Sequence, residues 1–74
     1  MTQREKILRH LQQFGSITPV EALRKYGIMR LAARVAELAE DHPIESMLVK
    51  GRNRFGEPVR FSRYVLKKQG PPQL

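Results

Sequence analysis

Cysteine is absent from this chain of 74 residues, and aromatic residues are few. Without cysteine, the chain has neither disulfides nor thiolate metal ligands to stabilise it. A chain of this length forms one small domain, which buries only about 60% of its unfolded surface. The core therefore depends on the packing of helices and strands, alone or with the help of a partner subunit.

Long apolar runs are missing as well. No stretch of the sequence approaches the roughly 20 apolar residues that a membrane-crossing helix needs. The chain begins with polar residues that lead straight into a helical pattern, which is not typical of a secretory signal. We therefore expect a soluble, cytoplasmic protein that does not act at a membrane.

Groups that could carry catalysis or hold a metal are sparse. The two histidines, His10 and His42, have no ligand partner at a spacing suited to metal binding. No serine has a base placed beside it, and no glycine opens a helix with Lys-Ser or Lys-Thr, as a phosphate-binding loop requires. The sequence therefore predicts a protein that is not an enzyme and that uses no metal or cofactor.

The last third of the chain is short of acidic residues. The net charge of the chain is +7, and the stretch Lys50–Lys68 holds seven basic residues against Glu57 alone, a net charge of +6. Residues 1–49 hold seven basic and six acidic residues, a net charge of only +1. This segregation gives the molecule one face that polyanions would seek, which favours nucleic acid as the partner and leaves an acidic protein as the alternative.

Two capping boxes mark the first two helices. Thr2 and Glu5 predict a helix over 3–14 that ends at Gly15. Its apolar stripe consists of Ile7, Leu8, Leu11 and Phe14. After a short extended connector or strand at Ser16-Ile17, the segment Thr18–Glu21 predicts a second helix over 19–26, with proline at its first position and Gly27 as its end. We expect the second helix to bury Val20, Leu23 and either Tyr26 or Ala22.

The segment Ile28–Glu40 is rich in good helix formers and predicts a third helix, which His42-Pro43 ends. One face of this helix carries Ile28, Leu31, Val35 and Leu38, and Arg30, Ala33 and Glu37 lie on the opposite side. From residue 44 the period changes to that of strands, which we expect at 44–50 and 58–66 around a glycine-containing turn. Residues 1–66 then form the domain, and residues 67–74 form a flexible basic, proline-containing tail.

This order of elements predicts an α+β fold, a winged helix-turn-helix of three helices followed by a β-hairpin wing. The run Tyr26–Val35, together with Thr18–Leu23, Asn53–Gly56 and Arg63–Leu66, resembles a family of small winged helix-turn-helix proteins common in bacteriophages and prophages. The resemblance covers about residues 2–66 and implies a phage-type DNA-binding protein, a regulator. The chain departs from the usual pattern at Met29-Arg30, where such helices often begin with serine or threonine.

The third helix offers candidate contacts to bases. The major groove admits one helix, and arginine is the side chain best suited to pair with guanine through two hydrogen bonds. We therefore predict DNA contacts for Arg30, Arg34 and the intervening Ala33. The alternative is a solvated helix face, on which Arg34 pairs with Glu37 or Glu40.

The hairpin offers candidate contacts to phosphates, namely Lys50, Arg52, Arg54 and Arg60. The alternative is that these charges keep an edge strand from pairing with other chains. Asn53 either reaches a minor-groove edge or supplies a turn conformation, and the turn is favoured. The aromatic rings of Phe55, Phe61 and Tyr64 could stack on unpaired bases, although packing on the helices is favoured for Phe61 or Tyr64.

The sequence thus predicts a sequence-specific double-stranded DNA-binding protein of phage or prophage type, associated with the nucleoid of a bacterial host. We expect a transcriptional regulator or an excisionase-like factor that acts as a homodimer or an array, because one small module buries too little surface for high specificity. The alternative is a protein-binding winged-helix module that docks on or inhibits a host complex, for example against a defence system. The acidic end of the third helix and its exposed Ala33 and Ala36 favour this alternative.

Overall fold

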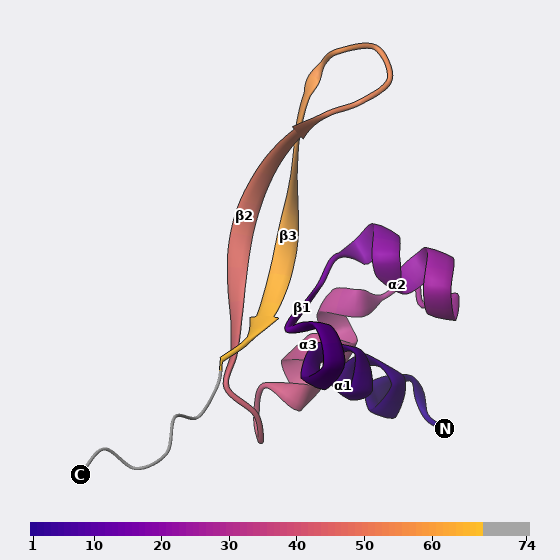
Figure 1. The fold of residues 1–74 in the computed structure, drawn as a ribbon, viewed down its shortest axis with the longest axis vertical. Coiled ribbons are helices and arrows are strands. Elements are labelled where there is room, and N and C mark those ends of the chain that lie inside the picture. The colour runs from indigo at the N-terminus through magenta and orange to yellow at the C-terminus, as the bar shows by residue number, and fades with distance from the viewer. Residues whose placement is uncertain (68–74) are drawn as a thin grey trace, which may run out of the picture.

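The computed structural model describes residues 1–67, and it contains three helices followed by a long antiparallel hairpin (Figure 1). The elements in chain order are α1 (Gln3–Phe14), β1 (Ser16–Ile17), α2 (Pro19–Tyr26), α3 (Leu31–Leu38), β2 (Ile44–Arg52) and β3 (Pro58–Leu66). This order confirms the predicted α+β fold class. Apart from Lys67, the predicted tail lies outside the described residues.

The caps of α1 and α2 confirm the predicted bounds of both helices. Each N-terminal threonine accepts a hydrogen bond from the backbone of a glutamate three residues on, whose carboxylate accepts one from the threonine N–H. Both helices end at a glycine with positive φ, 86° at Gly15 and 67° at Gly27. Glycine adopts this left-handed conformation without the steric penalty of other residues.

The face that α2 buries differs from the prediction. Ala22 is fully buried and Tyr26 packs against the core, whereas Val20 and Leu23 remain 56% and 51% exposed. Ala22 and Tyr26 are one turn apart on one face, and at about 100° per residue the other two side chains point well away from it. In this rotation of α2 the Tyr26 hydroxyl forms a hydrogen bond with the buried His10 of α1, a distant contact that the local pattern could not reveal.

Helix α3 is shorter than predicted, because it spans Leu31–Leu38 rather than residues 28–40. Gly27 and Ile28 form a turn in which the Ile28 N–H donates to the Ala22 carbonyl at 3.1 Å, and Arg30 at the N-cap has non-helical angles. Ile28 is still buried, so the predicted apolar face is confirmed although its first member precedes the helix. At the other end, the carbonyl of Leu38 accepts hydrogen bonds from Asp41 and His42 in a turn before the proline.

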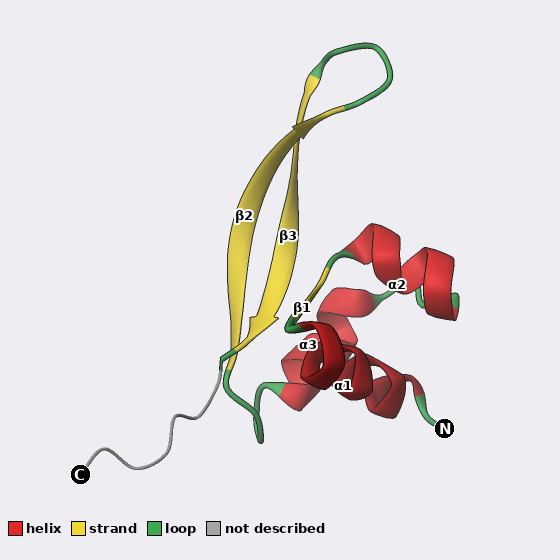
Figure 2. Ribbon diagram, viewed as in Figure 1, coloured by secondary structure: helices red, strands yellow, loops and turns green. Residues whose placement is uncertain are grey.

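The three strands form one antiparallel sheet in the order β1-β3-β2 (Figure 2). Strands β2 and β3 pair over nine residues, from Ile44 opposite Leu66 to Arg52 opposite Pro58, which is two residues longer on β2 than predicted. Strand β1 pairs only with Val65 and Tyr64 of β3. We call residues 44–66 the ribbon. Its base lies against the helices and its far end projects away from them (Figure 1).

The core lies between the three helices and the base of the ribbon. Eight apolar residues are buried there: Ile7, Leu11, Ile17, Ala22, Ile28, Leu31, Val35 and Leu38. His10 is buried among them, with Nδ1 2.7 Å from the Tyr26 hydroxyl and its ring 4.7 Å from that of Phe14. Burial lowers the pKa of His10, because the charged imidazolium is poorly solvated in the core.

Protonation of His10 is therefore expected to oppose folding. The unfolded chain binds the proton near pH 6.5 and the folded chain only at lower pH. Stability is thus complete above pH 7 and falls as the pH drops below about 6.5, by up to about 1.4 kcal/mol per pH unit until the folded-state pKa is reached. Urea unfolding between pH 5 and pH 8 measures this loss.

The matched control is His10→Phe, which keeps an aromatic ring at this position but cannot titrate. Its unfolding free energy should vary less between pH 5 and pH 7 than that of the unaltered protein. Equal pH dependence in the two proteins would contradict the role assigned to His10.

Candidate nucleic-acid interface

The two faces of the ribbon differ in chemistry, and the strand register decides which residues each face carries. Residues paired across β2 and β3 point to the same side, and successive residues alternate. Ile44, Tyr64 and Leu66 pack on the helical core, so their face is the inner face. The inner face continues outward through Ser46, Leu48 and Ser62 to Lys50, Arg60, Arg52 and Pro58.

The far half of the inner face is basic. Lys50 lies directly opposite Arg60 in the register, and Arg52 follows on the same side. All three side chains are exposed, and no acidic side chain within residues 1–67 forms an ion pair with them. Two like charges directly opposite each other weaken a strand pair. An external anion would relieve this repulsion, so the arrangement suits phosphates.

The outer face is mainly apolar. It carries Met47, Val49, Val59, Phe61 and Val65, besides Glu45 and Arg63. The ring of Phe61 covers Gly51, where an added Cβ would lie 3.3 Å from the ring edge. Of the two residues that the sequence analysis offered for packing on the helices, Tyr64 does so, whereas Phe61 packs within the ribbon. The far half of the inner face, not the outer face, concentrates positive charge.

The loop at the far end of the ribbon, Asn53–Glu57, is organised by the side chain of Asn53. Its Oδ1 accepts hydrogen bonds from the backbone N–H groups of Phe55 and Glu57, at 2.9 and 3.0 Å. Its Nδ2 donates to the Glu57 carboxylate at 3.1 Å. Arg52 Nη1 donates to the carbonyl of Gly56 at 2.7 Å. Asn53 thus supplies the turn conformation that the sequence analysis favoured. Arg54 is exposed, and Phe55 is 78% exposed.

The outward residues of α3 have little hydrogen-bonding capacity. Ala32 and Ala36 are exposed and Ala33 is half-buried, and all three offer only methyl groups. Arg30 is exposed at the N-cap. A hollow of about 300 Å³ joins this end of α3 to the base of the ribbon, with Arg30 and Ala33 on one side and Tyr64 on the other. The N-terminal end of α3 and the base of the inner face, at Tyr64, therefore border one depression.

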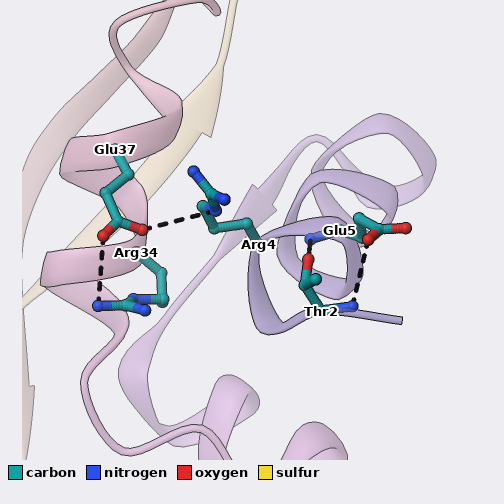
Figure 3. Close-up of polar contacts among 5 residues, drawn as sticks. All are labelled: Thr2, Arg4, Glu5, Arg34 and Glu37. Atoms are coloured by element: carbon teal, nitrogen blue, oxygen red, sulfur yellow. Dashed lines mark hydrogen bonds and ion pairs between the residues drawn. The ribbon is translucent and has the colours of Figure 1, made fainter.

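Arg34 does not line this hollow, but it lines a second one of about 300 Å³ together with Arg30, and its side chain pairs with Glu37 beside Arg4 of α1 (Figure 3). Its Nη2 is 3.4 Å from the Glu37 carboxylate, which also lies 3.7 Å from Nε of Arg4. The side chain of Arg34 is only 33% exposed, and its buried Nε has no hydrogen-bond partner within the described residues. The structure thus contains the Arg34–Glu37 pair that the sequence analysis named as the alternative. The pair is exposed enough to be worth only about 0.2–1 kcal/mol.

An apolar surface lies beside the N-terminal end of α3, and it includes Val20 and Leu23, which the sequence analysis assigned to the core. Val20, Leu23 and Met29 are 56%, 51% and 84% exposed, and they surround a shallow hollow of about 210 Å³. We call these three residues the α2 surface. For Val20 and Leu23, apolar character alone predicted burial, and only the placement of Ala22 and Tyr26 in the core excludes it.

Other kinds of site find no support among residues 1–67. No three histidine, cysteine, aspartate or glutamate side chains there lie close enough together to hold a metal ion. No helix in this part of the chain is both long and apolar enough to span a bilayer.

A family model described as a winged helix-turn-helix domain matches residues 2–69, nearly the whole chain. Searches of curated proteins and of solved structures gave no significant match.

Proposed function

This chain belongs to the winged helix-turn-helix domain family, and we propose that it is a sequence-specific double-stranded DNA-binding protein that uses Arg30 and the inner face of its ribbon. Domains of this family are typically DNA-binding and non-enzymatic. The observation that carries the proposal is the basic patch of Lys50, Arg52 and Arg60, which lies on the inner face of the ribbon in the strand register. We further propose a phage or prophage regulator or excisionase-like factor.

In this proposal the ribbon supplies affinity. Lys50, Arg52, Arg54 and Arg60 bind phosphates, and the release of condensed counterions drives association. The N-terminal half of α3 enters the major groove, because Glu37, Glu40 and Asp41 make the opposite end of the helix repulsive to phosphates. Asn53 acts at the interface by holding the loop that carries Arg54.

Base readout rests mainly on Arg30. It is exposed at the front of α3, and its neighbour Ala33 offers a methyl group that can contact thymine. Arg34 joins the interface only after leaving Glu37, which the small energy of this ion pair permits. A single module of this size buries about 600–1,000 Å² on DNA, so we propose that two copies occupy paired half-sites.

Removing charge from the inner face should flatten the salt dependence of DNA binding. The double variant Lys50→Ala/Arg60→Ala should reduce the slope of log K against log salt concentration by about 1.8, because each lost phosphate contact contributes about 0.9. The control Lys6→Ala/Arg9→Ala removes the same charge from α1 and should leave the slope nearly unchanged. Fluorescence anisotropy with a labelled duplex over a salt series gives both slopes. Equal slopes in the two variants would refute the assignment of the inner face.

A charge-conserving change at Arg30 should lower the sequence specificity of DNA binding and leave its salt dependence unchanged. Arg30→Lys keeps a cation for phosphates but loses the two parallel hydrogen bonds that arginine makes to guanine. The preference for the selected site over a site in which the contacted G·C pair is replaced should fall by about 1–3 kcal/mol. The salt slope should stay unchanged. The target site for this comparison comes from selection of bound oligonucleotides from a random pool. Arg34→Lys serves as the matched control and should keep most of the preference. Retention of full preference by Arg30→Lys would remove Arg30 from base readout.

The α2 surface favours a second candidate function, the docking of a host protein. Three apolar side chains this exposed on so small a domain suit a protein partner better than phosphates. If this candidate holds, Leu23→Lys should abolish nuclease-resistant capture of one identified host protein from lysate, while Lys50→Ala/Arg60→Ala retains it. Capture that disappears with nuclease treatment instead supports DNA as the partner.

A further inference from the structure

The most exposed aromatic ring in the described chain belongs to Phe55, which sits in the middle of the loop Asn53–Glu57. Its side chain is 78% exposed, and the loop lies at the end of the ribbon farthest from the helices (Figure 1). A single exposed apolar residue needs no explanation by itself. Two features of its surroundings, the order of the loop backbone and the charges beside it, give Phe55 a specific role.

The backbone that carries Phe55 is held from both sides. Asn53 Oδ1 accepts the Phe55 N–H at 2.9 Å, and the Gly56 N–H donates to the Asn53 carbonyl at 3.0 Å. Gly56 adopts φ of 76°, a conformation that other residues rarely accept. The ring is therefore presented to solvent on an ordered loop, so little entropy would be lost when it binds.

The residues that lead up to this ring are mostly basic. Arg54 precedes it directly, and Arg52 and Lys50 stand on the strand before the loop, while Glu57, whose carboxylate accepts a hydrogen bond from Asn53, is the one acidic residue of the loop. A ring flanked by cations suits a partner that has apolar planes between rows of negative charge. Stacked base pairs between two phosphate backbones have this character.

The width of the grooves selects the mode of contact. The minor groove is only about 6 Å wide, so it admits a loop tip and its side chains but not a two-stranded ribbon. With the front of α3 in the major groove, the tip of the ribbon is the part of the molecule that can reach the neighbouring minor groove. Phenylalanine is among the side chains that proteins insert between base pairs from this groove to bend DNA.

We propose that Phe55 is a wedge, which inserts between base pairs from the minor groove and bends the duplex, while Asn53 holds it in position. This inference rests on the proposed function, because it requires duplex binding. It adds a mechanical consequence, since the protein then shapes DNA as well as recognising it. Bending should be easiest at flexible pyrimidine–purine steps, which gives sequence preference at a position without hydrogen bonds to bases.

The test compares Phe55→Ala with Phe55→Leu on a duplex labelled at both ends for energy transfer. The unaltered protein should bend this duplex by about 20–90°. Phe55→Leu keeps an apolar wedge and should retain most of the bend, whereas Phe55→Ala should lose it while keeping the salt slope of binding. Because Phe55 is exposed, neither variant should change the unfolding midpoint. Asn53→Ala keeps the ring but frees the loop, and it should bend DNA less than the unaltered protein.

Three results would overturn the wedge. One is an equal bend with Phe55→Ala, and another is a straight duplex with the unaltered protein bound at saturation. The third is a Phe55→Ala variant that loses affinity for single strands but not for duplex, which would assign the ring to the stacking of unpaired bases. In each case the affinity of the unaltered protein for duplex DNA tests the proposed DNA-binding function independently of the bend. Absence of any duplex binding would remove both proposals.

Discussion

The packing of Ile44, Tyr64 and Leu66 on the helical core is the contact on which the rest of the molecule depends. These residues anchor the base of the ribbon to the helices. The short pairing of β1 with β3 and the hydrogen bond from the Leu66 N–H to the Gly15 carbonyl complete the anchor. Since side chains alternate along a strand, fixing one end determines which face Lys50 and Arg60 occupy. A slip of one residue would move this charge to the opposite face.

The two halves of the molecule do different work. Residues 7–38 supply all eight buried apolar residues, and residues 1–49 carry a net charge of only +1, so the body contributes stability and a frame. The ribbon contributes little to the core beyond its base, and its far half carries charge that opposes its own strand pairing. A two-stranded hairpin has marginal stability by itself. The charge on its far half therefore suits binding to an external partner. The charge, the loop and the family of the fold together favour DNA, a polyanion, as this partner.

The sequence predicted best what depends on neighbouring residues. The capping boxes at Thr2 and Thr18 and the glycines that follow placed α1 and α2 to the residue. The sequence failed where a distant contact decides. In the rotation of α2 that joins Tyr26 to His10 by a hydrogen bond, Val20 and Leu23 lie at the surface instead of in the core. Likewise, Gly27 and Ile28 form a turn that returns to Ala22, which delays the start of α3 to Leu31.

For the candidate site, strand period and charge were enough to predict a basic hairpin. They did not distinguish the two faces of the ribbon, and they did not show the hydrogen bonds by which Asn53 holds the loop. The pairing of Arg34 with Glu37 could be named only as one of two alternatives, because both residues sit on one helix and the sequence does not show what α1 places beside them.

The central claim is that the N-terminal end of α3 and the inner face of the ribbon form one DNA-binding surface. Amide chemical-shift mapping during titration with a short duplex at low salt tests it most directly. The account predicts the largest shifts at residues 30–33, 50–54 and 60, and it is contradicted if the shifts fall instead on α1 or on the outer face at Met47 and Phe61.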